Sequence, residues 1–346
     1  MKMNPLGRTG ISVSQICLGT MTFGSQNTES DGFAQMDLAF DHGVNFFDTA
    51  EMYPFPSTPE TYGQSEIVLG AWIKARGNRN KVVIATKIVG PGARFKHVRD
   101  GDIKFNRAHL IQAVDDSLQR LGVDAIDLYQ THWPERPTNY FGKLDYDHDP
   151  DAEWTPFTET LSVMDEIVKA GKVRAFGVSN ETPWGVAAHL KLADDNAWPR
   201  VASIQNPYCL LNRSFEIGLA EMAIREECGL LAYSPLGFGA LTGKHLDGAT
   251  KPQSRRALFP DFMRYFHDRA EAATREYVAL AQAHDLDPAQ MSLAFVNSRS
   301  FLTANIIGAT TLAQLQSNLA ATELVLSDEV LAGIEDIHTA HPNPSP

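Results

Sequence analysis

Two apolar runs and the helical segment between them decide the fold: residues 82–87, VVIATK, and residues 125–132, AIDLYQTH. Between these runs, apolar residues recur at positions 110, 111, 114, 118 and 121, which is the spacing of one helix face. Asn106 is a suitable N-cap for this helix, and Gly122 is a suitable stop. A strand, a helix and a second strand in this order predict parallel strands joined by a right-handed crossover.

The same alternation extends along the chain, in which eight apolar runs are expected to be strands: Gln15–Gly19, Val44–Asp48, Val82–Lys87, Ala125–His132, Val173–Val178, Ala202–Gln205, Gly229–Ser234 and Asn305–Ile307. Eight strand–helix units in 346 residues predict a closed (β/α)8 TIM barrel, with residues 1–346 forming one domain. The structural alternative is an open doubly wound sheet. It is disfavoured because residues 18–24, LGTMTFG, lack the G-x-G-x-x-G spacing, and no P-loop is present.

Composition excludes several other classes of protein. With 30 Lys+Arg, 42 Asp+Glu and a formal net charge of −12, the chain is poorly suited to binding nucleic acid. The first residues lack the pattern of a signal peptide, and the longest uncharged stretch, Cys228–Gly243, is too short and broken to span a membrane. The three cysteines lie far apart, which indicates reduced core residues and not metal ligands. We therefore expect a cytoplasmic protein that binds neither membranes, nucleic acid nor metal.

Three stretches are longer than ordinary loops: 89–105, 133–154 and 236–265. Each follows a predicted strand, so in a barrel all three lie on the C-terminal face, where active sites occur. The second stretch combines aromatic residues with five acids, Asp145, Asp147, Asp149, Asp151 and Glu153. Its aromatic residues suggest a pocket for an apolar or ring-bearing compound, whereas the acids could equally face solvent.

Ionisable residues end three consecutive predicted strands, namely Asp48, Lys87 and His132, and Tyr53 follows in the loop after Asp48. Taken singly, each has an ordinary structural explanation: a cap or turn, a lysine at the rim, a core histidine and a loop aromatic. Their joint placement at adjacent strand ends is harder to explain by packing, because buried unpaired charges are costly.

These four side chains suit proton transfer to a carbonyl oxygen. A phenol is a weak acid at neutral pH, and a nearby ammonium lowers its pKa. A carboxylate would keep the lysine charged and oriented, and a histidine can hydrogen-bond the substrate oxygen. A hydride would have to come from a cofactor, since no side chain can supply one.

At this point the sequence resembles the aldo-keto reductase family, and within it most closely the bacterial Tas-type subgroup, which is also similar to potassium-channel β-subunits. The resemblance runs in order from Gly7 to about Leu326 and is carried by residues 45–53 (NFFDTAEMY), 62–66 (YGQSE), 127–134 (DLYQTHWP), 177–180 (GVSN), 205–208 (QNPY) and 233–237 (YSPLG). It implies a barrel that binds NADPH in extended form. It also implies that Asp48, Tyr53, Lys87 and His132 are the catalytic tetrad, with Tyr53 as the general acid.

The resemblance also implies where the cofactor binds. Residues matching the nicotinamide site are Ser179, Asn180, Gln205 and Tyr233, and those matching the pyrophosphate path are Ser234, Leu236, Gly237, Gly243, Lys244, Ser254 and Arg255. Gly308, Thr310, Gln314 and Asn318 match the adenosine segment, where many members carry basic or acidic residues at Gly308, Gln314 and Ser317. These positions therefore do not reinforce a preference for the 2′-phosphate, which Lys244 and Arg255 could bind instead. Trp133 and Phe23 are the expected substrate contacts.

The leading functional hypothesis is an NADPH-dependent reductase of aldehydes or ketones. A nucleotide-sensing binding module, as in the channel β-subunits, is the alternative from another class. A barrel aldolase or isomerase with a Schiff base on Lys87 is a third. The sequence does not indicate the physiological substrate or the oligomeric state.

Overall fold

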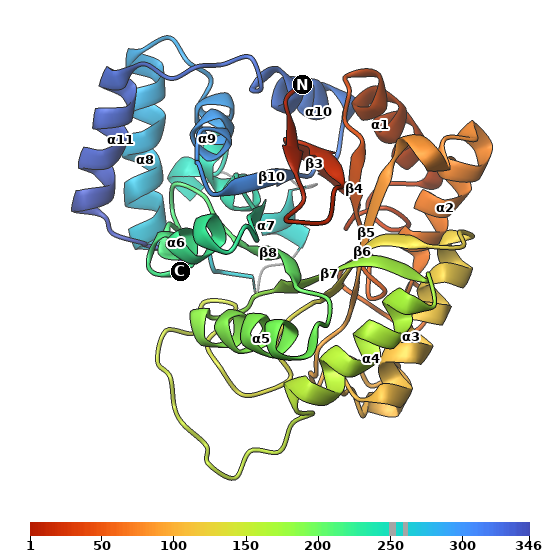
Figure 1. The fold of residues 1–346 in the computed structure, drawn as a ribbon. Coiled ribbons are helices and arrows are strands. Elements are labelled where there is room, and N and C mark those ends of the chain that lie inside the picture. The colour runs from red at the N-terminus through yellow and green to blue at the C-terminus, as the bar shows by residue number, and fades with distance from the viewer. Residues whose placement is uncertain (249–253, 259–261) are drawn as a thin grey trace.

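A computed structural model describes residues 1–248, 254–258 and 262–346, excluding the side chains of Asp247 and Arg255. Eight parallel strands close into a barrel in the order β10-β3-β4-β5-β6-β7-β8-β9, with helices around it (Figure 1). The barrel strands are β3 (Ile16–Gly19), β4 (Phe46–Asp48), β5 (Val83–Ile88), β6 (Ile126–Thr131), β7 (Val173–Ser179), β8 (Val201–Pro207), β9 (Leu230–Tyr233) and β10 (Leu302–Ile307). Each coincides with one of the predicted runs, which confirms the (β/α)8 barrel.

The surrounding α-helices are α1 (Glu29–Asp41), α2 (Gln64–Arg76), α3 (Arg107–Leu121), α4 (Phe157–Lys169), α5 (Pro183–Asn196), α6 (Leu219–Arg225), α7 (Arg255–Leu258), α8 (Asp268–Ala283), α9 (Pro288–Asn297), α10 (Leu312–Ala320) and α11 (Asp328–Ala340). Short 3-10 turns are η1 (Arg79–Lys81), η2 (Arg99–Gly101), η3 (Ser214–Glu216), η4 (Gly237–Thr242) and η5 (Leu246–Gly248). Within these described segments, no helix is both long and apolar enough to cross a membrane.

Helix α3 shows how local sequence sets its ends. The Asn106 side chain accepts a hydrogen bond from the backbone N–H of His109, and Gly122 follows the helix with φ 63°. Asparagine satisfies an otherwise unpaired N–H at a helix start, while glycine adopts the left-handed conformation without a steric penalty. Both predicted boundaries are therefore confirmed.

An N-terminal hairpin, β1 (Met3–Pro5) and β2 (Ser12–Ser14), was not predicted, because its strands are short and lack a clear apolar alternation. It brings Leu6, Ile11 and Val13 into the apolar cluster inside the barrel. Gly7 lies so close to the barrel that an added Cβ would stand 2.7 Å from the carbonyl oxygen of Ala202. The hairpin therefore covers one end of the barrel with apolar side chains.

Strand register positions the polar strand ends. Asp48 pairs with Ala85 across β4 and β5, and Lys87 pairs with Gln130 across β5 and β6. Because parallel strands all point the same way, their carboxyl ends meet at one rim. The long stretches 89–105, 133–154 and 236–265 all leave from that rim.

Candidate active site

A buried ion pair lies at the centre of the rim. The Lys87 ammonium donates to Oδ1 of Asp48 at 2.6 Å and to the carbonyl oxygen of Thr49 at 2.7 Å. Lys87 has no exposed surface and Asp48 is only 3% exposed. Burial alone would lower the pKa of Lys87, but the negative charge of Asp48, the neighbouring Tyr53 and Cys17 and the hydrogen bond to Asp48 together outweigh burial and raise the pKa above its usual value. Lys87 is therefore held as a cation.

Tyr53 and His132 lie above this pair. The Tyr53 hydroxyl is 3.4 Å from Nε2 of His132, and the Lys87 ammonium is 4.9 Å from the centre of the Tyr53 ring. Burial and, to a lesser degree, the positive charge of Lys87 lower the pKa of His132 well below its usual value. His132 is thus a neutral imidazole at neutral pH. Together with the Tyr53 hydroxyl it presents two hydrogen-bonding groups to one spot.

Glutamine amides hold the other side of Asp48. Gln205 donates from Nε2 to Oδ2 of Asp48 at 2.9 Å, and Gln130 donates to the same oxygen at a longer 3.4 Å. Both carboxylate oxygens are therefore satisfied, as a buried charge requires. Cys17 lies beside the pair, where burial raises the pKa of its thiol well above the usual value. It is a protonated core residue, in line with the prediction from cysteine spacing.

Glu51 is a central residue of the site, although in the sequence it stands out only as part of the motif at residues 45–53. Its carboxylate, fully buried, accepts two hydrogen bonds from Arg99 at 2.6 and 3.0 Å. It also accepts from the backbone N–H of Val89 at 2.7 Å and from the Tyr62 hydroxyl at 2.6 Å. Glu51 therefore links the loop that carries Tyr53 to the stretch 89–105. The spacing of residues along the chain could not have shown this link, because Glu51 and its partners are distant in sequence.

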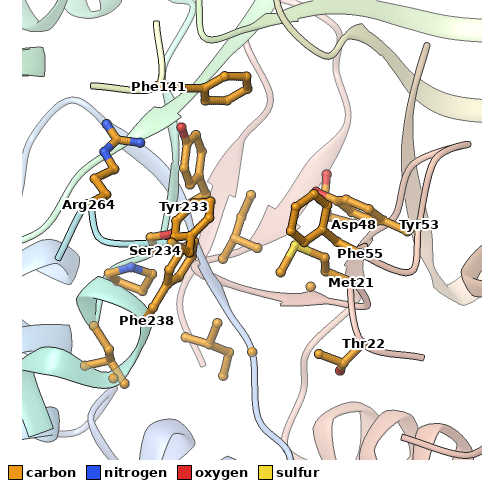
Figure 2. A pocket seen from close by; sticks show the side chains of 18 of the residues that line it. Met21, Thr22, Asp48, Tyr53, Phe55, Phe141, Tyr233, Ser234, Phe238 and Arg264 are labelled. Carbon is orange, nitrogen blue, oxygen red and sulfur yellow. The ribbon is translucent and has the colours of Figure 1, made fainter. Parts of the chain in front are cut away.

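One large cavity of about 1260 Å³ opens at this rim. Of the predicted site residues, those lining it are Asp48, Tyr53, His132, Trp133, Ser179, Asn180, Gln205, Tyr233, Ser234, Leu236, Lys244, Ser254, Gly308, Thr310, Gln314 and Asn318. Figure 2 shows Tyr233 and Ser234 across this cavity from Asp48 and Tyr53.

Other predicted site residues do not line the cavity. Lys87 lies behind Asp48 and Tyr53, and Gly237 and Gly243 lie in and after η4 without reaching the cavity surface. The side chain of Arg255 is outside the described part of the structure. Because Lys87 is enclosed and hydrogen-bonded to two acceptors, a Schiff base with substrate at this residue is disfavoured.

The prediction that Phe23 contacts substrate is wrong. Phe23 has no exposed surface and belongs to the core cluster between barrel and helices. An added Cβ on Gly32 would lie 3.1 Å from its ring, so the ring packs against α1. Its neighbours Met21 and Thr22 line the cavity instead. The local sequence identified the right loop but did not show which side chain points inward.

The predicted nicotinamide residues form one connected group. Asn180 donates from Nδ2 to the carbonyl oxygen of His132 at 2.9 Å, and its Oδ1 accepts from the Tyr233 hydroxyl at 2.6 Å. Ser179 donates to the carbonyl oxygen of Gln205 at 2.7 Å. Asn180 adopts φ 54°, a left-handed conformation that asparagine tolerates better than most residues. The tetrad and this group therefore share direct hydrogen bonds.

The shape and chemistry of the cavity fit an extended dinucleotide. Near the tetrad, the amides of Asn180 and Gln205 and the ring of Tyr233 can hold a planar polar ring. The cavity continues to the segment 306–311 and to α10, whose N-cap is Thr311. Helix N-termini favour anionic groups, and Lys244 adds a cation to the lining. An added Cβ on Gly308 would meet no atom within 4 Å, so the backbone is open there.

Aromatic side chains wall the part of the cavity near Tyr53. Phe55, Phe95, Trp133, Tyr140 and Phe141 all line it. The acids of the stretch 133–154 are exposed and do not line the cavity. They are Asp145, Asp147, Asp149, Asp151 and Glu153. The two possibilities left open by sequence are thus both realised, with Trp133, Tyr140 and Phe141 lining the cavity and the acids in solvent.

Comparison with known proteins gives the same answer as the geometry. The sequence model of the Aldo/keto reductase family matches residues 15–339. The chain is 47% identical to "Protein tas" of Escherichia coli K12 over the full length of both chains. It is 30% identical to an Arabidopsis thaliana protein named probable voltage-gated potassium channel subunit beta, covering 99% of this chain and 98% of that one. It is also 30% identical to an E. coli NADH-specific methylglyoxal reductase, covering 95% of each.

The barrel, the cavity at its carboxyl rim and the family match together show an oxidoreductase that uses a nicotinamide cofactor. The chain belongs to the aldo-keto reductase family. The family resemblance seen in the sequence, including the similarity to Tas and to channel β-subunits, is thereby confirmed.

Proposed function

We propose that this chain reduces aldehydes or ketones to alcohols with NADPH, and that Tyr53 is the general acid. The observation that carries the proposal is the convergence of the Tyr53 hydroxyl and the His132 imidazole, 3.4 Å apart, on the aromatic part of the cavity. Behind them stands the buried cation of Lys87, paired with Asp48 at 2.6 Å. Such an arrangement is suited to stabilising charge that develops on a carbonyl oxygen.

Each residue has a separate part in the proposed reaction. When bound, NADPH supplies the hydride to the carbonyl carbon. The Tyr53 hydroxyl donates its proton to the carbonyl oxygen, and neutral His132 hydrogen-bonds the same oxygen and orients it. The Lys87 cation, 4.9 Å from the ring centre, stabilises the phenolate that remains. Asp48 keeps Lys87 charged and fixes its position.

The remaining site residues are proposed to hold the cofactor. Ser179, Asn180 and Gln205 would bind the carboxamide of the nicotinamide, against the face of Tyr233. Ser234, Leu236 and Ser254 would follow the pyrophosphate, and the cavity-lining segment from Gly308 to Asn318 would hold the adenosine. Lys244 is proposed to bind the 2′-phosphate that distinguishes NADPH from NADH.

The test is turnover. Oxidation of NADPH and of NADH is followed by absorbance with a panel of aldehydes, ketones and quinones. The proposal predicts carbonyl-dependent oxidation, faster with NADPH, and a larger loss for NADPH than for NADH in Lys244→Ala. Equal losses with the two cofactors would show that Lys244 does not read the 2′-phosphate.

A nucleotide-sensing module is the second candidate, favoured by the similarity to a protein named as a potassium-channel β-subunit. The same assay separates the two functions, because a sensor would bind NADPH without carbonyl-dependent oxidation. We further propose that residues 1–346 act as one domain in the cytoplasm, where the three buried thiols would stay reduced.

A further inference from the structure

Resting on this proposed function, we propose that the preferred substrates are carbonyl compounds with an apolar, ring-sized body and an anionic group, and that Arg94 binds that anion at the cavity mouth. Three features of the cavity support this site: the aromatic wall, the distribution of charge along the lining, and the anchoring of the loop that carries Arg94.

The wall near Tyr53 fixes the body of the substrate. Phe95 and Trp133 pack with ring centres 5.5 Å apart, and Trp133 and Phe141 do so at 5.5 Å. Phe55 also lines the cavity, next to Tyr53 (Figure 2). Side chains of this kind bury planar apolar groups and offer few hydrogen bonds. An apolar ring would therefore pack against this aromatic wall.

Charge along the lining is uneven. Among the described lining residues, the acidic side chains are Asp48, which is paired with Lys87, and Asp287, which caps α9 at the adenosine end. The mouth near the aromatic wall carries two arginines, Arg94 and Arg264, and no Asp or Glu side chain from the described residues. Pro346 also lines it, and a main-chain oxygen of Pro346 accepts a hydrogen bond from Arg264. In a chain of net charge −12, the positive charge of Arg94 at this mouth favours an anionic ligand.

Of the two arginines, Arg94 is available to a ligand. Arg264 donates to a main-chain oxygen of Pro346, the last residue of the sequence, at 2.8 Å and hydrogen-bonds Tyr233. No acid in the described ranges forms an ion pair with Arg94, which is exposed. Arg99, in the same stretch, is bound by Glu51 at 2.6 Å. The guanidinium of Arg94 can therefore offer its paired N–H groups to a carboxylate or phosphate.

Although its guanidinium is exposed, Arg94 stands on an anchored segment. Phe95, beside it, is 8% exposed and packs on Trp133. The Trp133 indole donates to the carbonyl oxygen of Pro91 at 3.0 Å. Beyond Phe95, the pair of Arg99 with Glu51 ties the stretch to the loop that carries Tyr53. The backbone of residue 94 is therefore held close to the aromatic wall and to the general acid.

The experiment compares benzaldehyde with 4-carboxybenzaldehyde in the wild type, in Arg94→Gln and in Lys96→Gln. Lys96 is the matched control, because it is exposed on the same stretch and does not line the cavity. In Arg94→Gln we expect kcat/KM for the carboxylated aldehyde to fall about fivefold, as for one partly exposed ion pair, with benzaldehyde unchanged. High salt should reduce the ratio of kcat/KM for 4-carboxybenzaldehyde to that for benzaldehyde in the wild type but not in Arg94→Gln.

An equal loss for both aldehydes in Arg94→Gln, or the same selective loss in Lys96→Gln, would overturn the proposal. Failure of the proposed function is distinguished by a binding measurement that needs no turnover. Calorimetric titration with 4-(hydroxymethyl)benzoate and with benzyl alcohol should show tighter binding of the anion to the wild type, and loss of that difference in Arg94→Gln. If neither aldehyde is reduced but this difference is found, the reductase assignment fails and the anion site stands. If the difference is absent, the anion site fails.

Discussion

The substitution Glu51→Gln tests whether the buried pair of Glu51 and Arg99 holds the site loops together. The carboxylate accepts hydrogen bonds from Arg99, from the Val89 backbone and from Tyr62, and none of its surface is exposed. Burial raises the pKa of Glu51, but the hydrogen bonds and positive charge of Arg99, together with the hydrogen bonds from Tyr62 and the Val89 backbone, outweigh burial, so that the net pKa lies below its usual value. Glutamine keeps the shape, removes the charge and replaces one acceptor oxygen by an NH2 donor.

The expected loss follows from burial. The Arg99 and Glu51 side chains are 4% and 0% exposed, so that Glu51→Gln leaves the guanidinium in a protein interior without a counter-charge. Breaking a buried pair in this way costs about 3–5 kcal/mol, which is a large fraction of the roughly 5–15 kcal/mol that stabilises a typical protein. The matched control is Asp195→Asn, because Asp195 forms an exposed i,i+4 pair with Lys191. Its expected cost is below about 1 kcal/mol.

Urea unfolding, followed by the fluorescence of the buried Trp72 and Trp133, gives the free energy of unfolding for each variant. In the double variant Glu51→Gln/Arg99→Gln, the unneutralised charge is gone, and we expect it to be more stable than Glu51→Gln alone. A Glu51→Gln protein within 1 kcal/mol of the wild type would refute the reasoning. A double variant whose loss of unfolding free energy equals the sum of the losses in Glu51→Gln and in Arg99→Gln would refute it too, because additive losses mean that the two side chains are not coupled.

Three further outcomes are expected. The pKa of His132 lies well below 6.5 in the folded state and is about 6.5 in the unfolded state. The stability that neutral His132 contributes is therefore fully present above pH 6.5 and is lost progressively as the pH falls below it. His132→Gln should therefore flatten the fall of unfolding free energy below pH 6.5 by up to about 1.4 kcal/mol per pH unit, and an unchanged slope contradicts this. Gly70→Ala would place a Cβ 2.3 Å from the carbonyl oxygen of Leu121 and should destabilise the fold by about 1–3 kcal/mol in urea, whereas wild-type stability would contradict the close contact of α2 with α3. Gly90→Ala would place a Cβ 2.3 Å from Nε1 of Trp133 and should lower kcat/KM for aromatic aldehydes by about tenfold or more with little change in the Kd of NADPH, and undiminished kcat/KM would refute a role for Trp133 in substrate binding.

The fold was predictable because its signals are local. Eight apolar runs, a helix N-cap at Asn106 and a stop at Gly122 each depend on a few neighbouring residues. The hairpin of β1 and β2 was not predicted, because strands of three residues show too little alternation of apolar and polar residues. Its stability comes from packing on the barrel. Local patterns therefore predicted the strands and helices of the barrel but not the hairpin that covers one of its ends.

The site was predictable to the extent that strand order determines it. Asp48, Lys87 and His132 could be placed together because parallel strands end at one rim, and Tyr53 could be added because its loop follows Asp48 directly; the family resemblance then implied that Tyr53 is the general acid. Contacts between side chains far apart in sequence could not be read in this way. Glu51 and Arg99 are 48 positions apart, and the inward direction of Met21 in place of Phe23 depends on how one loop packs against α1.

The central claim is that Tyr53 supplies the proton, and Tyr53→Phe tests it most directly, because the change removes one hydroxyl and leaves the ring above Lys87. The measurement is the single-turnover rate of NADPH oxidation with a saturating aldehyde, together with the Kd of NADPH from fluorescence titration. We predict a fall in rate of about 10²–10⁴-fold with a Kd close to that of the wild type. A Tyr53→Phe enzyme that oxidises NADPH at nearly the wild-type rate would contradict the account.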